Sequence, residues 1–281
     1  MGKPTNIAQV PQLSVFRYPG GKTWFVPCAR KWLKARPNKP RLLVEPFGGG
    51  GIITLTAINE DLVTRALLVE KDPMIAAVWK VCLGPNAAKL ARAIRNYKFD
   101  AKTVVEQIRS DQQSQDPVQI AFAVILLNRI RRGGVMANGA GILKTGENGN
   151  GLSSRWYPET LAARVEAIYA LRDRIEFVEG DGFKVVSDYA SWKSAVFFVD
   201  PPYTEAGKRI YSHWELDHEA LLKRLSKVVG DFIVTYDDTS QTRKWAHATG
   251  LKCENINMKA TSHLVKQELL VGRDLSWVTT I

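Results

Sequence analysis

The pattern that most constrains the fold is an apolar strand followed by a turn and a helix, which occurs twice near the start of the chain. Residues 42–47 are mostly apolar, run into glycines at 48–51, and precede the helix-compatible stretch 52–59. Residues 66–72 repeat the strand, and Pro73 suits the first turn of a helix that ends near Gly84 and Pro85. Two such units with short connections predict a parallel, doubly wound sheet.

The stretch from 86 to 132 has a different pattern, with consecutive helices and no strand. Its clearest helix spans 117–132, where Asp116 can cap the helix and Pro117 can occupy its first position. Residues 133–151 hold seven glycines and three asparagines, so we expect a loop there. We therefore predict a catalytic domain formed by residues 1–84 and 161–281, interrupted by a mainly helical module at 85–160.

Alternating helices and strands return after the insertion. We expect helices at 159–174 and 218–229, and strands at 175–179, 195–199 and 232–236. Two further strands, at 253–259 and 267–271, are separated by polar-leaning residues, which indicates a terminal antiparallel hairpin. The predicted fold is thus α/β, a mostly parallel sheet with an antiparallel hairpin at its end.

The charge of the chain favours an anionic partner. Its 281 residues are 45% hydrophobic, enough for a substantial core, and 39 Lys and Arg against 28 Asp and Glu leave a net charge of +11. Nucleic acid is the leading candidate for that partner.

Other composition features argue against several classes of protein. The three cysteines have no CxxC spacing and the four histidines no metal-ligand spacing, so we expect neither a disulfide framework nor a metal site. The first eleven residues have no apolar signal core, and no apolar run is long enough to span a membrane. We expect a soluble, cytoplasmic protein without a membrane partner.

The most informative motif for chemistry is Asp200-Pro201-Pro202-Tyr203, which follows the apolar run 195–199. A carboxylate can accept hydrogen bonds, the rigid Pro-Pro step can aim a backbone carbonyl, and an aromatic ring can stack on a base. Together these groups describe a pocket for a planar amino group. The chemistry they indicate is methyl transfer to an exocyclic nitrogen of a nucleobase.

A Gly-rich turn and an acidic residue suggest a cofactor site near that motif. Glycines at 48–51 would let a ligand approach the backbone closely, although the GxGxxG dinucleotide pattern is absent. About twenty residues further on, Glu70 ends the second strand, where an acid can bind ribose hydroxyls, and Asp72 competes for this role. Gly21, Lys22 and Thr23 resemble the end of a phosphate-binding loop, but Phe16 stands where its first glycine is required.

Five sequence blocks in this order resemble the D12-class, Dam-like adenine-N6 DNA methyltransferases. They are FRYPGGK (16–22), EPFGGGG (45–51), LLVEKDP (67–73), EGDGF (179–183) and DPPY (200–203), with an insertion between the third and the fourth. The resemblance covers most of the chain outside residues 85–160. It implies a Rossmann-like methyltransferase sheet with an inserted helical module for DNA recognition.

The resemblance also implies cofactors, partners and roles for individual residues. The methyl donor would be S-adenosylmethionine, converted to S-adenosylhomocysteine, with no metal, and the substrate a flipped-out adenine in double-stranded DNA. The matching positions give cofactor contacts to Tyr18, Lys22, Phe47, Gly48, Gly50, Glu70, Asp181, Phe183 and Asp200, and the catalytic block to Asp200, Pro201, Pro202 and Tyr203. Within the insertion we assign DNA contacts to Arg129, Arg131, Arg132 and Lys144, although a solvated helix end explains the arginines about as well.

Two departures from the family leave the target open. The run Leu127 to Gly134 differs from the aromatic- and Asn-rich sequence of the branch that reads GATC, and Thr235 to Thr239 replace an Asn-His-Asp-Thr run, so the latter receive no catalytic role. The alternatives are an RNA adenine-N6 methyltransferase, transfer to cytosine N4, and a catalytically silent DNA-binding relative. The recognised sequence, the oligomeric state and the choice between host regulation, phage defence and restriction-modification are not indicated.

Overall fold

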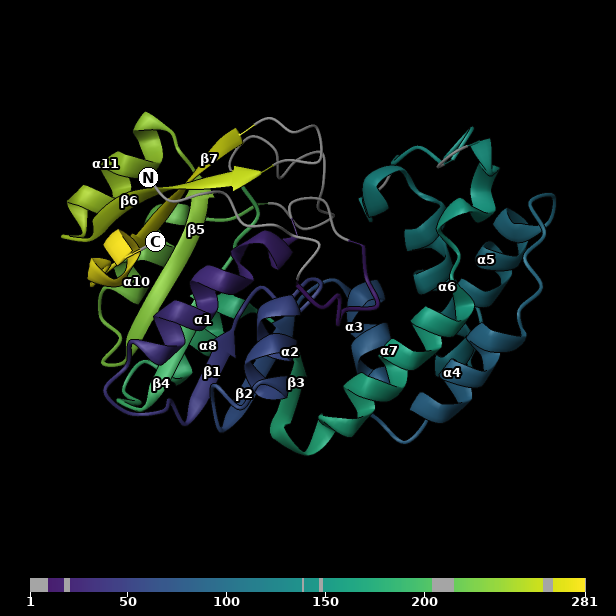
Figure 1. The fold of residues 1–281 in the computed structure, drawn as a ribbon, viewed down its shortest axis with the longest axis horizontal. Helices are drawn as coiled ribbons and strands as arrows, with labels where there is room; N and C mark the ends of the chain where they lie inside the picture. Colours follow the sequence, from purple (N-terminus) through teal and green to yellow (C-terminus); the bar gives the residue numbers. More distant parts are fainter. Residues whose placement is uncertain are drawn as a thin grey trace.

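A mixed seven-stranded sheet forms the centre of the protein in our computed structural model, which describes residues 10–17, 21–137, 139–146, 149–203, 215–259 and 265–280. The strand order is β3-β2-β1-β4-β5-β7-β6 (Figure 1). The first five strands are parallel and β7 joins β5 in antiparallel fashion. Their bounds are β1 Leu42–Glu45, β2 Arg65–Glu70, β3 Ile175–Glu179, β4 Ala195–Val199, β5 Asp231–Asp237, β6 Lys252–Lys259 and β7 Val265–Gly272. The predicted parallel sheet with a terminal antiparallel hairpin is confirmed.

Helices cover both faces of the sheet, which explains why the central strands are apolar on both sides. Alternate residues of one strand enter different cores: Leu43 lies in the core under α1 (Val26–Lys34), α2 (Ile52–Asn59) and α3 (Pro73–Cys82), whereas Leu42 and Val44 lie in the other. The second core includes residues of α8 (Gly182–Asp188), α10 (His218–Leu225) and α11 (Ser240–Ala248). Parallel strands buried on both faces are expected to be continuously apolar, as Ala195–Val199 is.

Aspartates cap the beginning of four of the helices. The carboxylates of Asp72, Asp116, Asp181 and Asp217 each accept a hydrogen bond from a backbone N–H in the first turn of α3, α6, α8 and α10, respectively. The helix predicted for 117–132 ends earlier, at Ile130, because Arg131 is extended and Gly133 and Gly134 have positive φ. We did not predict α1, α8 or α11.

Four helices form a module beside α3, namely α4 (Ala87–Asn96), α5 (Val104–Gln112), α6 (Pro117–Ile130) and α7 (Pro158–Ala170) (Figure 1). α6 packs against α3, and α7 packs against α4. Arg95 of α4 forms ion pairs with Glu159 and Glu166 of α7. α7, which lies at the boundary predicted for the inserted module, thus packs on its first helix.

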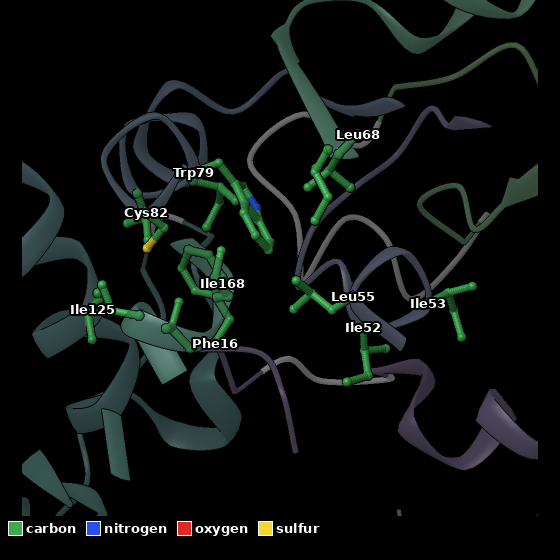
Figure 2. Close-up of a cluster of buried hydrophobic side chains, with 14 of the residues drawn as sticks. Phe16, Ile52, Ile53, Leu55, Leu68, Trp79, Cys82, Ile125 and Ile168 are labelled. Atoms are coloured by element: carbon green, nitrogen blue, oxygen red, sulfur yellow. The ribbon is translucent and has the colours of Figure 1, made fainter. Parts of the chain in front are cut away.

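The segment 10–17 joins the module to the sheet domain. Phe16 is buried beside Trp79 of α3, with ring centroids 6.3 Å apart. Figure 2 shows the two rings among Cys82, Ile125 and Ile168, with Leu55 and Leu68 of the sheet domain on the other side. One continuous core therefore extends from the sheet into the module.

Candidate active site

A cavity of about 820 Å³ lies at the carboxyl ends of the central strands. The chain proceeds from β1 to β2 and β3 in one direction, and β4 and β5 lie on the opposite side of β1. Ligands of open α/β sheets bind at such a switch in strand order. The cavity is lined by residues that follow β1, β2, β3 and β4, and by residues of the segments 12–17 and 21–24. It therefore brings together all five sequence blocks that resemble the methyltransferase family.

The Gly-rich turn forms one wall of this cavity. Gly51 caps α2 with a left-handed backbone (φ 60°), and a Cβ at this position would lie 2.7 Å from Trp79. A Cβ on Gly48 would lie 2.9 Å from the carbonyl oxygen of Val69. Gly50 and Phe47 line the cavity as well. The glycines thus let the turn pack closely against the second strand and Trp79.

Glu70 and Asp72 have different tasks in the structure. The Glu70 carboxylate accepts hydrogen bonds from the backbone N–H groups of Gly49 and Asp72, both at 2.8 Å, and lines the cavity. Burial raises the pKa of Glu70 to about 7. The Asp72 carboxylate caps α3 by accepting from Met74 N at 2.9 Å. The Gly-rich turn therefore holds Glu70 in the cavity wall through the N–H of Gly49, whereas the Asp72 carboxylate is used to cap α3.

The turn after β3 forms another part of the cavity wall. Asp181 and Phe183 both line the cavity, and Asp181 accepts a hydrogen bond from Phe183 N at 2.8 Å. A guanidinium group, that of Arg224, lies over the Phe183 ring, 5.3 Å from its centroid. Tyr18, the remaining predicted cofactor residue, lies outside the described residues.

Lys22 links the residues of the DPPY block. Its ammonium lies 2.9 Å from Asp200 Oδ1 and donates to the Tyr203 hydroxyl at 2.6 Å. Tyr203 in turn donates to Glu268 of β7 at 3.0 Å. Thr235 of β5 donates to the same Oδ1 of Asp200 at 2.7 Å. Lys22 and Thr235 therefore fix the Asp200 carboxylate at the cavity wall, which Pro202 also lines.

Burial and charge act in opposite directions in this cluster. Lys22 is only 4% exposed, and burial alone would lower its pKa, but the charges of Asp200 and Glu268 more than offset this and raise it. Lys22 is thus an ammonium ion. Burial raises the pKa of Glu268 to about 7, an effect that the Lys22 charge opposes and the Asp200 charge reinforces.

Glu45 is another carboxyl group at this end of the sheet, and it was not predicted as a site residue. It lines the cavity and accepts hydrogen bonds from Thr54 N at 2.9 Å and Thr54 Oγ1 at 2.5 Å. Burial, reinforced by the nearby Asp200 charge, raises its pKa to about 8. Glu45 is the last residue of β1, directly before the Gly-rich turn, and this position in the sequence could have identified it as a site residue.

The predicted DNA contacts are not alike in the structure. Arg132 and Lys144 are exposed, whereas Arg131 is half-buried and donates to the carbonyls of Met136 and Ala137 at 2.8 and 3.2 Å. Arg129 is only 6% exposed and donates to the carbonyl of Val15. This burial disagrees with a direct DNA contact by Arg129, because its guanidinium is used to hold the segment 10–17.

Asn128, next to it, is a structural residue that sequence reasoning missed. Its side chain accepts from Arg17 N at 2.8 Å and donates to the carbonyls of Arg17 and Gly134 at 2.9 and 2.8 Å. Arg164 of α7 donates to the carbonyl of Ser14 at 3.1 Å. The module thus holds the segment that carries Arg17, and Arg17 lines the cavity. Only the three-dimensional contact between these distant segments identifies this role.

The part of the chain that the structure describes contains neither a metal-ligand cluster nor a membrane-spanning helix. No group of three or more His, Cys, Asp and Glu side chains there could hold a metal ion. None of the helices in the described ranges is both long and apolar enough to cross a membrane.

Comparison with known proteins gives similarity only at the level of solved structures. No family model and no curated protein matches the chain, whereas 66 chains of solved structures do. One is the rRNA methyltransferase aviRa from Streptomyces viridochromogenes, with a TM-score of 0.44 and 12% identity over 99% of this chain and 96% of that chain.

A second match is the precorrin-6y C5,15-methyltransferase from Geobacter metallireducens, with a TM-score of 0.38 and 8% identity over 87% of this chain and 85% of that chain. A third is a SAM-dependent methyltransferase from Agrobacterium tumefaciens. The match to the latter has a TM-score of 0.41 and 8% identity, covers 89% of this chain, and spans 61% of that protein's chain. All three matches have TM-scores below 0.5 and identities of 12% or less.

Proposed function

We propose that this protein is a methyltransferase that uses S-adenosylmethionine to methylate the N6 amino group of adenine in duplex DNA. The observation that carries the proposal is the fixed Asp200 carboxylate, held by Lys22 and Thr235 at the wall of a cavity whose other wall is the Gly-rich turn. An acceptor for an amino group and a backbone that a ligand can approach closely therefore face the same space.

The residues of the cavity fit the proposed cofactor. Its volume of about 820 Å³ lies within the range of small-molecule sites. The Gly-rich turn at 48–51 lines the cavity, and Glu70 presents a carboxyl group of the kind that binds ribose hydroxyls.

Asp200 and Pro201 would act on the base. The amino nitrogen of adenine is a poor nucleophile because its lone pair is delocalised into the ring. Hydrogen bonds from this amino group to the Asp200 carboxylate and the Pro201 carbonyl would favour a pyramidal nitrogen and orient its lone pair. When bound, S-adenosylmethionine supplies a methyl group on a sulfonium centre as the electrophile.

Tyr203 would hold the base in place. Its ring can stack on adenine, while its hydroxyl is fixed by Lys22 and Glu268. Bringing adenine to this pocket from a duplex requires base flipping, which costs a few kcal/mol and is offset by stacking and by phosphate contacts.

The helical module would recognise the DNA. Arg132 and Lys144 are exposed on the segment that follows α6, and the neighbouring Gly133 and Met136 line the cavity. Arg17 connects this region to the cavity from the N-terminal side. Basic side chains beside the pocket could hold the phosphates that flank a flipped base, and the net charge of +11 supports such a partner.

One experiment separates the proposed substrate from its alternatives. The protein is incubated with methyl-labelled S-adenosylmethionine and either duplex DNA or ribosomal RNA, and the nucleosides are identified by mass spectrometry. We expect N6-methyldeoxyadenosine from DNA. N6-methyladenosine formed only in RNA would show that the substrate is RNA and not DNA. N4-methyldeoxycytidine would show that the target base is cytosine and not adenine. No transfer, together with no cofactor binding by calorimetry, would favour a catalytically silent DNA-binding protein.

A further inference from the structure

The hydrogen bonds around Lys22 form a continuous chain from the cavity wall to a buried carboxylate. From Asp200 Oδ1 the chain passes to Lys22 Nζ at 2.9 Å, to the Tyr203 hydroxyl at 2.6 Å, and to Glu268 Oε2 at 3.0 Å. The direct distance from Lys22 Nζ to Glu268 Oε2 is longer, 3.5 Å. The Tyr203 hydroxyl is therefore the better link, since it accepts from Lys22 and donates to Glu268.

Glu268 is placed where a purely structural residue would more often be apolar. It belongs to the central part of β7, is 5% exposed, and has the buried residues Leu269, Leu270 and Val271 after it. A buried carboxylate is costly unless it is paired, and Glu268 is paired with two members of the chain, Lys22 and Tyr203. The cost suggests that the carboxylate serves the reaction.

We propose that Glu268 is the final acceptor of the proton that adenine N6 loses after methyl transfer. This inference rests on the proposed function. Methyl transfer breaks the carbon–sulfur bond, forms the N6–carbon bond and leaves a positive charge on N6, so one N6–H bond must then break. The electron pair of that bond returns to the nitrogen, and the proton goes to the Asp200 carboxylate.

The hydrogen-bond chain can then move this proton away from the product. Tyr203 passes its hydroxyl proton to Glu268, Lys22 then passes an ammonium proton to the Tyr203 oxygen, and the amine nitrogen of Lys22 takes the proton from Asp200. At the end Asp200 is again a carboxylate, Lys22 an ammonium and Tyr203 a phenol, while Glu268 is a carboxylic acid. One proton has moved from N6 to Glu268, with no oxidation or reduction.

The charges around Glu268 are compatible with this role. Lys22 and Asp200 face it from the cavity side, Tyr203 donates to it, and Asp237 of β5 lies opposite it in the strand register. On the other side, β6 places the apolar Ile256 opposite Glu268. With its pKa raised to about 7, Glu268 can take up a proton near neutral pH and release it to water between turnovers.

The test is the pH dependence of the single-turnover methyl-transfer rate, which excludes product release from the measurement. For the wild-type protein we expect the rate to fall as the pH drops below about 7, because Glu268 then starts protonated. In Glu268→Gln we expect a rate lower by at least about tenfold at pH 8, and no inflection near pH 7, since general acid–base groups contribute on the order of 10²–10⁴-fold. Tyr203→Phe, which keeps the ring but breaks the chain, should show the same two changes.

Two controls complete the design. Glu254→Gln removes an exposed carboxylate of the same hairpin and should keep the inflection. S-adenosylmethionine affinity, measured by calorimetry, should be similar in Glu268→Gln and wild type. A wild-type-like inflection in Glu268→Gln would overturn the proposal while leaving the methyltransferase function intact. Absence of methyl transfer by the wild-type protein would instead overturn the proposed function.

Discussion

Replacing Glu45 by Gln should make the protein less sensitive to alkaline pH. Gln is nearly isosteric with Glu, and its carbonyl oxygen can still accept the hydrogen bonds from Thr54 N and Thr54 Oγ1. The change therefore removes the ionisable group and leaves the packing and the hydrogen bonds in place.

The magnitude follows from the pKa of Glu45, which burial raises from 4.5 to about 8. The folded state holds this proton more tightly than the unfolded state, so the stabilisation that the group contributes is complete below pH 4.5 and is lost as the pH rises through about 8. At about 1.4 kcal/mol for each tenfold change in proton affinity, the total loss is about 5 kcal/mol, of which about 2 kcal/mol falls between about pH 6 and about pH 8.

The assay is urea unfolding of both proteins at a series of pH values. Glu70 and Glu268 also have raised pKa values and contribute in the same direction to both proteins, so the quantity of interest is the difference between the two free energies of unfolding. We expect Glu45→Gln to gain about 2 kcal/mol on wild type between about pH 6 and about pH 8. A difference that stays constant over this interval would refute the reasoning.

Three further predictions concern the cavity and the module. Asp200→Ala should retain S-adenosylmethionine binding at least in part but lose methylation, because it removes the acceptor for the amino group; near-normal transfer of a tritiated methyl group would contradict this assignment. Gly51→Ala should lower the free energy of unfolding by about 1–3 kcal/mol, because an alanine at φ 60° is strained and its Cβ would lie 2.7 Å from Trp79; an unchanged urea midpoint would count against the close approach. Arg132→Gln and Lys144→Gln should each reduce the salt dependence of duplex binding by a slope of about 1, unlike the control Lys193→Gln, an exposed residue just before β4 at the amino ends of the parallel strands; equal slopes in all variants would show that neither residue contacts phosphate.

Local sequence patterns predicted the sheet well, because the signals for it are local. The apolar runs 42–47, 66–72 and 195–199 and the cap Asp116 each act within a few residues, and the strands and helices form where those signals lie. The α8 and α11 helices were missed because they are short and moderately polar, so packing on the sheet stabilises them more than their own sequence does.

The parts of the site that sequence could not predict depend on contacts between distant segments. Thr235 joins the cluster around Asp200 because β5 lies next to β4 in the sheet, and Glu268 joins it because β7 lies next to β5. Arg129 is basic and follows a predicted helix, but the segment 10–17 crosses it and its guanidinium is buried. The local sequence shows that Arg129 is basic, but it does not show that the distant segment 10–17 packs over its side chain.

The measurement that tests the central claim most directly is nucleoside mass spectrometry of duplex DNA incubated with the protein and S-adenosylmethionine. The account predicts N6-methyldeoxyadenosine with wild-type protein and none above background with Asp200→Ala. Methylated adenine from both proteins in equal amount would contradict the role of Asp200, and a different methylated base would contradict the proposed substrate.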